Sequence, residues 1–176
     1  DLSEIYNPPA LLFYQGNIDL LELPKVAVVG SRDSSKHGNQ SVQKIIKELN
    51  NELIIVSGLA RGIDTAAHMA ALQNGGRTIA VIGTGLDVFY PKANKKLQSY
   101  IGKNHLVLSE YGPGEQPLKF HFPERNRIIA GLCRGVIVAE ASDSLPHTLS
   151  INTSLLMTRL GWTRRIFKIE NSLKLS

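Results

Sequence analysis

The sequence predicts an α/β fold: a doubly wound, mostly parallel Rossmann-like sheet with helices on both faces. Two observations predict it. Short apolar, β-branched runs alternate with helical patterns along most of the chain, and this alternation is typical of βαβ units. The chain has 176 residues, of which 43% are hydrophobic and 20% are charged, as expected for a globular domain with one core.

The apolar runs are short and end in small or polar residues, so each is expected to be a buried strand. In chain order they are Lys25–Gly30, Leu53–Ser57, Thr78–Gly83, His105–Glu110 and Gly135–Glu140. Between them, apolar residues recur at helical spacing. The expected helices are Asn39–Leu49, Ile63–Gln73, Asn94–Gly102 and Pro123–Arg134. Because ligands bind at the carboxyl ends of the strands in such sheets, the loops after the strands should carry the function.

We expect one Rossmann domain over residues 1–141, made of an N-terminal extension (1–24) and a core (25–141). Residues 142–176 form a tail that could add a last helix and strand to this domain, with Arg165–Ile169 as the strand. Lys and Arg number 20 against 15 Asp and Glu, giving a net charge of +5. This balance favours polyanionic partners only weakly.

The start of the chain, Asp1-Leu2-Ser3-Glu4, lacks the basic and apolar pattern of a signal peptide. The chain also lacks an apolar run long enough to span a membrane, so we expect a cytoplasmic protein. Cys133 is the only cysteine, which excludes an internal disulfide and a cysteine-based metal cluster. It lies in an apolar stretch and is expected to be a small core residue.

Glycine-containing turns follow the first three expected strands. Gly30-Ser31-Arg32 combines a hydroxyl with a forked cation suited to phosphate. Ser57–Gly62 leads into a helix whose first N–H groups attract anions, and we favour a capping role for Asp64 at that helix start. Gly83-Thr84-Gly85 is the third turn. The alternative for each is an ordinary surface turn. The candidate binding residues in these turns are Ser31, Arg32, Ser57, Gly58, Arg61, Gly62, Gly83 and Gly85.

The densest group of basic and aromatic residues is Lys119–Arg127. It alternates cations for phosphates with rings on which bases can stack, as proteins that bind single strands do. The candidates here are Lys119, Phe122, Arg125 and Arg127, with both arginines near the positive end of the helix that Pro123 opens. In the alternative interpretation, Phe120 and Phe122 pack into the core and the arginines form surface salt bridges.

Several kinds of chemistry are not supported by the sequence. The first turn lacks the G-x-G-x-x-G dinucleotide pattern, and Gly75-Gly76-Arg77-Thr78 is not a P-loop. His68 and His121 have no evident nucleophile partner, and metal-ligand spacings are missing. We therefore expect no enzyme activity, no cofactor and no metal, and we expect His68 to be a packed helix residue.

The turns and the basic cluster resemble the DprA family, also called Smf. The resemblance extends from about Tyr6 to Ala141. The segments that carry it are Val28–Arg32, Val56–His68, Gly83–Asp87, Ser109–Tyr111 and Phe122–Leu132. It implies an extended Rossmann domain that binds single-stranded DNA without strong sequence preference. In the family this domain protects incoming DNA during natural transformation and helps to load the RecA recombinase, usually as a homodimer.

By the same resemblance, the DNA contacts map onto Arg32, Lys119 and Phe122, together with the glycine turns and Arg125 or Arg127. After Ala141 the sequence departs from the family pattern. In the family that stretch holds the dimer contacts and part of the recombinase-facing surface. The departure leaves open whether this chain forms the dimer and loads RecA.

Two alternatives belong to other functional classes. The first is a nucleotide- or phosphoribosyl-binding enzyme of the lysine-decarboxylase-like Rossmann superfamily. That group carries a Pro-Gly-Gly-x-Gly-Thr motif, which Gly83-Thr84-Gly85 does not match, and the acidic candidates Asp87, Glu110 and Glu140 lie far apart in the sequence. The second is a scaffold that binds a recombinase and binds DNA only incidentally.

Overall fold

The computed structural model describes residues 2–49 and 51–140, and the backbone of residues 166–169. Its strands form a seven-stranded sheet in the order β1-β5-β4-β3-β2-β6-β7. Their bounds are β1 Phe13–Gly16, β2 Lys25–Gly30, β3 Ile54–Ser57, β4 Thr78–Ile82, β5 Leu106–Ser109, β6 Val136–Ala139 and β7 Ile166–Ile169. All neighbouring pairs are parallel except β1 and β5. The predicted doubly wound, mostly parallel sheet is confirmed.

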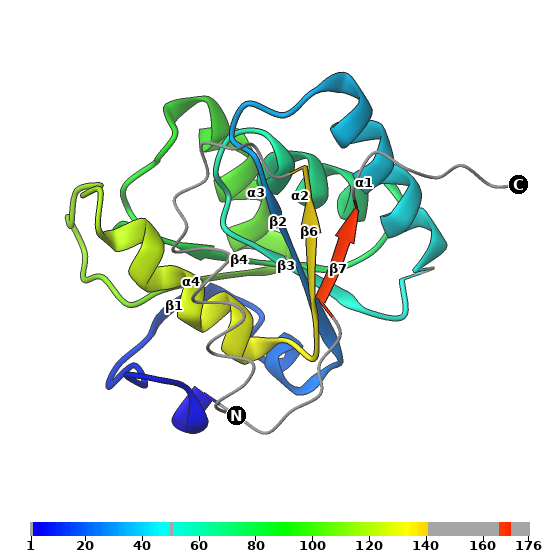
Figure 1. Cartoon of the computed structure of the whole chain (residues 1–176). Helices are drawn as coiled ribbons and strands as arrows, with labels where there is room; N and C mark the ends of the chain where they lie inside the picture. The colour runs from blue at the N-terminus through cyan, green and yellow to red at the C-terminus, as the bar shows by residue number, and fades with distance from the viewer. Residues whose placement is uncertain (1, 50, 141–165, 170–176) are drawn as a thin grey trace, which may run out of the picture.

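Helices cover both faces of this sheet (Figure 1). Their bounds are α1 Lys36–Glu48, α2 Ile63–Gln73, α3 Lys95–Asn104 and α4 His121–Leu132, with short 3-10 helices η1 Leu2–Glu4, η2 Ile18–Glu22 and η3 Lys92–Asn94. Helix α4 packs on one face, together with η1 and η2, while α1, α2 and α3 pack on the other. Among the described helices, none has both the length and the apolar character needed to cross a membrane.

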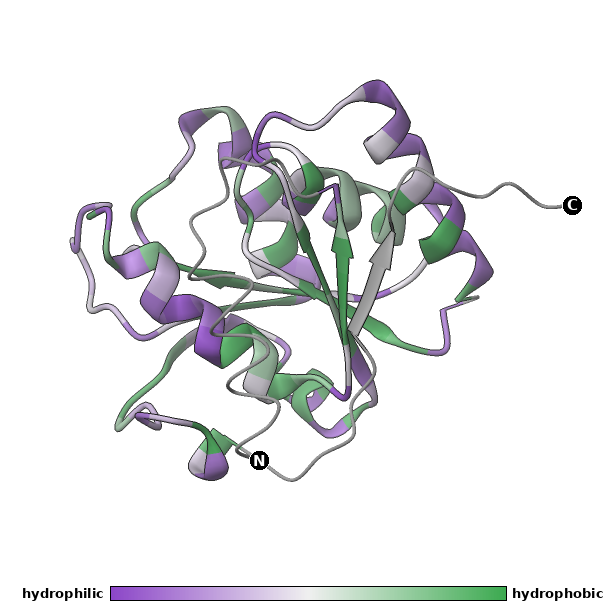
Figure 2. Ribbon diagram, viewed as in Figure 1, coloured by the Kyte–Doolittle hydropathy of each residue, from purple (hydrophilic) through white to green (hydrophobic). Residues whose placement is uncertain are grey.

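The core lies where the apolar strands meet the apolar sides of these helices, as the hydropathy colours show (Figure 2). Every residue of β3, β4 and β5 is buried. Cys133, at the end of α4, is buried as predicted. His68 is also fully buried in α2, which agrees with its predicted packing role.

Two helices begin earlier than predicted, and one strand was not predicted, for physical reasons. The α1 helix begins at Lys36 because the Ser35 hydroxyl accepts a hydrogen bond from the Gly38 N–H (3.0 Å) and caps the helix three residues before the predicted start. The α4 helix begins at His121, so Pro123 is inside its first turn. N–H groups in the first turn have no acceptor within the helix, so the missing N–H of proline costs no hydrogen bond there. Strand β1 was not predicted because it is short and largely exposed at the sheet edge.

The strand expected at Arg165–Ile169 is present as β7, which pairs with β6. The helix expected within the tail lies outside the described residues. The division of the chain near residue 141 remains a prediction.

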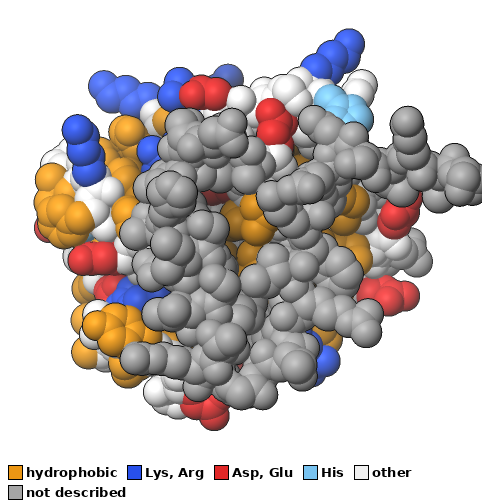
Figure 3. All heavy atoms as spheres, in the orientation of Figure 1, with side chains coloured by type: hydrophobic (Ala, Val, Ile, Leu, Met, Phe, Trp, Pro, Cys, Tyr) orange, Lys and Arg blue, Asp and Glu red, His pale blue; other side chains and the backbone are white. Residues whose placement is uncertain are grey.

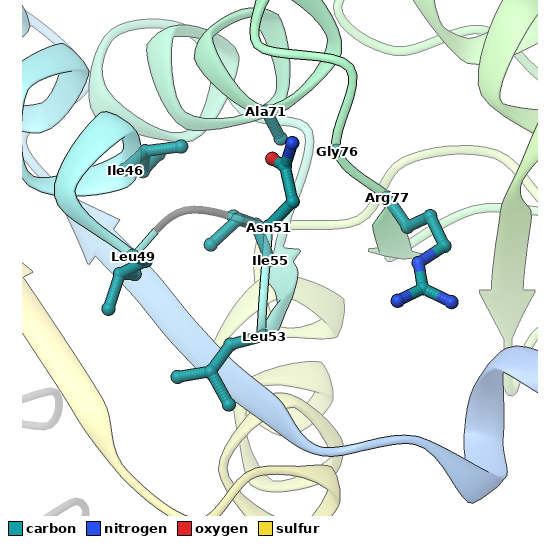
Figure 4. A pocket seen from close by; sticks show the side chains of 8 residues that line it. All are labelled: Ile46, Leu49, Asn51, Leu53, Ile55, Ala71, Gly76 and Arg77. Carbon is teal, nitrogen blue, oxygen red and sulfur yellow. The ribbon is translucent and has the colours of Figure 1, made fainter.

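The order of strands reverses between β2 and β6, which are neighbours in the sheet although three strands separate them in sequence. In doubly wound folds this switch point opens a crevice at the carboxyl ends of the two strands. The pocket in Figure 4 lies at the opposite, amino edge, between the ends of α1 and α2. Its lining is mainly apolar, with Asn51 and Arg77 as polar members. The candidate binding residues do not line it.

Candidate functional site

At the switch point, the loop after β2 is bonded to the end of β6. The Ser31 N–H donates to the carbonyl of Glu140 (2.9 Å). The Glu140 carboxylate accepts hydrogen bonds from the N–H and the hydroxyl of Ser35, at 2.8–2.9 Å. Gly38 makes room for it, since a Cβ there would lie 1.7 Å from the carboxylate. The positive N-terminus of α1, where Rossmann folds hold a pyrophosphate, therefore already contains an internal anion.

The second glycine turn is also bonded internally. Gly62 has φ +75°, and a Cβ on it would lie 2.2 Å from the Ser31 carbonyl oxygen. The Ile63 N–H donates to this same carbonyl (3.0 Å). The Ala60 N–H donates to the Asp64 carboxylate (3.3 Å). The prediction of an open anion cradle at this turn is therefore wrong, and so is the prediction that Asp64 caps its own helix, because Asp64 bonds the preceding loop instead.

Arg125 lies beneath this turn rather than at the surface. Its side chain reaches from α4 across the carboxyl ends of β3 and β4, and only 3% of the residue is exposed. Nη1 donates to the carbonyl of Gly58 (2.6 Å) and to that of Val81. The prediction of an exposed phosphate-binding cation is therefore wrong for Arg125, whose guanidinium is occupied by backbone carbonyls.

Arg125 and Asp64 influence each other electrostatically. Burial lowers the pKa of Arg125 to about 10, and the attraction of Asp64 opposes that fall. Burial raises the pKa of Asp64, and Arg125 opposes that rise. Each charge therefore stabilises the other in an interior that would otherwise favour the neutral forms. Arg125 remains a cation at neutral pH.

Most of the other turn residues have structural roles. Ser57 is buried, and its hydroxyl donates to the Val28 carbonyl (2.6 Å). Ser31 is buried and accepts the Asp33 N–H (3.2 Å). Gly83 lies against the Phe122 ring, where a Cβ would be 3.1 Å from the nearest ring carbon, and at Gly85 a Cβ would lie 2.5 Å from a neighbouring backbone oxygen. The glycines allow the loops to pack against each other and against Phe122.

Arg127 forms an ion pair instead of facing the crevice. Its Nη1 and Nη2 donate to the two carboxylate oxygens of Glu110, at 2.8 and 2.6 Å. Its Nε donates to the Asn7 carbonyl (2.7 Å), which ties the N-terminal arm to α4. The predicted role as a free cation is therefore wrong for Arg127, although the salt-bridge partner is Glu110 and not a neighbour on its own helix.

The remaining candidates are exposed or half-buried. The exposed Arg32 holds its guanidinium carbon 5.2 Å from the centre of the half-buried Phe122 ring. On the loop before α4, Lys119 is exposed, and Phe120 is 57% exposed, so the alternative with Phe120 in the core is wrong. Arg61 is exposed, with its guanidinium 3.9 Å from the Asp33 carboxylate. Cations and an aromatic ring are therefore presented at one edge of the sheet.

Figure 3 agrees with this placement: Lys and Arg side chains gather along the upper rim, the edge toward which β2 and β6 run in Figure 1. Tyr90 is a member of the site that the sequence did not identify. Tyr90 is 44% exposed, and the centre of its ring lies 5.4 Å from that of Phe122, with an angle of 33° between the ring planes. The sequence places the two rings 32 residues apart (122 − 90), and only the packing of the third turn against α4 brings them together.

Comparisons with known proteins agree with this architecture. The family model of DNA recombination-mediator protein A matches residues 1–158. DNA processing protein DprA of Streptococcus pneumoniae is 82% identical over 141 residues, which is 80% of this chain and 50% of that protein. DprA of Bacillus subtilis is 41% identical over 174 residues, covering 98% of this chain and 57% of that protein. The chain thus spans about half the length of these relatives.

Solved structures give the same result. The X-ray structure of S. pneumoniae DprA has a TM-score of 0.89 and 70% identity, and the match covers 98% of this chain and 59% of that one. The structure of DNA processing protein A from Helicobacter pylori has a TM-score of 0.83 and 32% identity, covering 100% and 80%. The chain therefore belongs to the DNA recombination-mediator protein A family, the DprA/Smf family.

Proposed function

We propose that this chain binds single-stranded DNA and that it acts by binding rather than by catalysis. The observation that carries the proposal is the exposed Arg32 guanidinium over the Phe122 ring. A planar cation can hold a phosphate through paired hydrogen bonds, and an adjacent ring can stack a base. This arrangement combines the two contacts that a single strand needs, within one short stretch of surface.

The solved H. pylori relative binds single-stranded DNA, and this supports the proposal. We further propose that the protein takes part in DNA processing during natural transformation, protects incoming DNA and helps to load RecA as a homodimer. Sequence preference should be weak, because phosphate contacts and ring stacking do not read base edges.

The proposed contact residues are those that are accessible at the edge of the sheet: Arg32, Arg61, Lys119, Phe122 and Tyr90. The other candidates shape the surface from within or through internal bonds. They are Ser31, Ser57, Gly58, Gly62, Gly83, Gly85, Arg125 and Arg127.

The positions of the acidic residues favour binding over an enzyme of the phosphoribohydrolase type. Glu110 is paired with Arg127, Asp87 accepts the Gly114 N–H (2.8 Å), and Glu140 is bonded to Ser35. Each carboxylate thus has a structural partner in a different loop, so these three do not converge on one substrate position. The histidine in α2, His68, is fully buried and its pKa falls to about 3.

A titration with single-stranded and double-stranded oligonucleotides at several salt concentrations tests the proposal. Affinity for the single strand should fall steeply with salt, because bound phosphates release counterions. Arg32→Ala combined with Lys119→Ala should lower affinity at every sequence and reduce the salt slope by about 1.4, because each lost phosphate contact to a single strand contributes about 0.7. Unchanged binding and slope in the double variant would refute the site.

The scaffold alternative predicts a different result. If contact with a recombinase is the main activity, a pull-down with purified RecA should succeed equally with and without DNA. It should also be unaffected by Arg32→Ala. Retention of RecA that depends on DNA and on Arg32 would favour the binding function.

A further inference from the structure

Arg125 is a buried cation that joins two strand ends. Its Nη1 bonds the carbonyls of Gly58 and Val81, the first at 2.6 Å. Gly58 follows the last residue of β3, and Val81 is near the end of β4. A side chain from α4, on one face of the sheet, thus fixes the spacing of two strand ends from which the loops of the site begin.

The fit around this guanidinium is close. A Cβ on Gly58 would lie 2.4 Å from Nη1 and 2.6 Å from the guanidinium carbon. Nε is buried without a partner among the described residues. Burial of a guanidinium costs desolvation free energy, which its carbonyl bonds and the attraction of Asp64 must offset. An apolar side chain could fill the same space but could not bond the two carbonyls, so the arginine supplies more than packing.

Contacts lead from Arg125 to both halves of the site. On one side, the Gly58–Gly62 loop abuts the Ser31–Arg32 turn: a Cβ on Gly62 would lie 2.2 Å from the Ser31 oxygen and 2.7 Å from that of Arg32. On the other side, β4 leads to Gly83, whose carbonyl lies 3.1 Å from the His121 ring and where a Cβ would lie 3.1 Å from the Phe122 ring. Contacts thus connect Arg125 to Arg32 through the Gly58–Gly62 loop and to Phe122 through β4 and Gly83.

We propose that Arg125 is a positioning residue: without touching DNA, it holds the ends of β3 and β4 so that Arg32 and Phe122 face the single strand together. This inference rests on the proposed function. It assigns to the buried Arg125 the control of the contact between Arg32 and Phe122 at the surface.

The first test is a double-mutant cycle on binding of a single-stranded oligonucleotide. Arg125→Met should weaken binding about tenfold when Arg32 is present and much less in the Arg32→Ala background, because residues that act through one another are not additive. The loss should keep its full size in the Lys119→Ala background. Equal losses with and without Arg32 would overturn the proposal.

Lys25 offers a matched control. It is also a buried cation bonded to two carbonyls, those of Leu21 (2.5 Å) and Leu23 (2.7 Å), but it lies at the amino end of β2, at the opposite edge of the sheet. Lys25→Met should destabilise the fold and leave the affinity of the folded protein unchanged. A loss of affinity equal to that of Arg125→Met would show that general destabilisation is the cause, and would overturn the proposal.

A second readout needs no DNA. In the free protein, the Phe122 ring should shift the side-chain proton resonances of Arg32 upfield. This shift should vanish in Arg125→Met and persist in Lys25→Met, and a persistent shift in Arg125→Met would overturn the proposal. If wild-type protein fails to bind DNA, the proposed function fails, while this measurement still tests the positioning role by itself.

If Arg125→Met does not fold, Arg125→Lys takes its place, because an ammonium keeps the charge but lacks the planar fork. It should reduce the Arg32 shift and the DNA affinity together. A fall in affinity with an unchanged shift, or no change in either, would overturn the proposal.

Discussion

The guanidinium carbon of Arg32 lies 5.2 Å from the centre of the Phe122 ring, although the two residues are far apart in the sequence. A cation at this distance from an aromatic face is attracted to it. The contact orders a long, exposed side chain before any ligand arrives, and ordering a binding group beforehand lowers the entropy cost of binding.

Replacement of the ring should weaken DNA binding. Phe122→Leu removes both the stacking face and the contact with Arg32, so affinity for a single strand should fall about fivefold to 150-fold, given ~1–3 kcal/mol per stacked base. Fluorescence anisotropy with a labelled oligonucleotide measures this. Phe120→Leu, which replaces a more exposed ring two residues earlier, is the matched control and should lower the affinity less. Equal losses of affinity in the two variants would show that Phe122 has no special role in DNA binding.

Two glycines with similar φ angles differ in what surrounds them. Gly62 and Gly75 have φ +75° and +70°, but a Cβ meets the Ser31 oxygen at 2.2 Å in the first case and nothing within 4 Å in the second. Gly75→Ala should lower the free energy of unfolding by about 1–2 kcal/mol from strain alone. Gly62→Ala should lower it further, because Ser31 must move and because the ψ of −128° at Gly62 is unfavourable for alanine. Urea unfolding measures both, and equal values would show that the turn can relax.

The buried His68 should make stability depend on pH. The Thr78 hydroxyl donates to the Ile55 carbonyl (2.7 Å), so His68 Nδ1 must carry the proton of its own 2.7 Å bond to Thr78. Burial, aided by the charge of Arg125, lowers the pKa of His68 to about 3. In the unfolded chain the pKa is near 6.5. Between these values the unfolded state binds the extra proton, so acid favours unfolding.

The stability contributed by neutral His68 is therefore complete above pH 6.5 and is lost as the pH falls toward 3, at about 1.4 kcal/mol per pH unit. Urea unfolding between pH 4 and 7, about the range of that loss, measures the slope. In His68→Leu, Thr78 keeps its bond to Ile55, and the slope should fall by about one proton relative to wild type. An unchanged slope would show that other groups cause the acid sensitivity.

The ion pair between Arg127 and Glu110 should stabilise the fold more than a surface pair does. Each carboxylate oxygen accepts one hydrogen bond from the guanidinium, and the side chains of Arg127 and Glu110 are 10% and 24% exposed. A double-mutant cycle with Arg127→Gln and Glu110→Gln should give a coupling energy of about 1–3 kcal/mol in urea unfolding. Arg127→Gln alone should cost more than Glu110→Gln, because it also releases the Asn7 carbonyl. A coupling energy near zero would show that the pair contributes no more to stability than an exposed surface pair.

Much of the fold could be predicted from the sequence, because local pattern controls it. The buried strands are continuous apolar runs, and α2 begins and ends at the predicted residues Ile63 and Gln73. Strand β1 escaped prediction because it has four residues and its pairing with β5 depends on a partner more than 90 positions away, in the register Phe13 to Ser109. Local pattern carries no information about such a partner.

The sequence by itself determined which loops lie at the carboxyl edge of the sheet, with Arg32 and Lys119 in two of them and Phe122 in the first turn of the helix that follows Lys119. Only the tertiary structure decided which charges reach the surface. Arg125 and Arg127 look like Arg32 in sequence, yet one is enclosed by the carbonyls of Gly58 and Val81 and the other by Glu110 and Asn7. Whether a guanidinium is free for a phosphate depends on the acceptors that distant segments bring to it, and these acceptors meet only when the chain has folded.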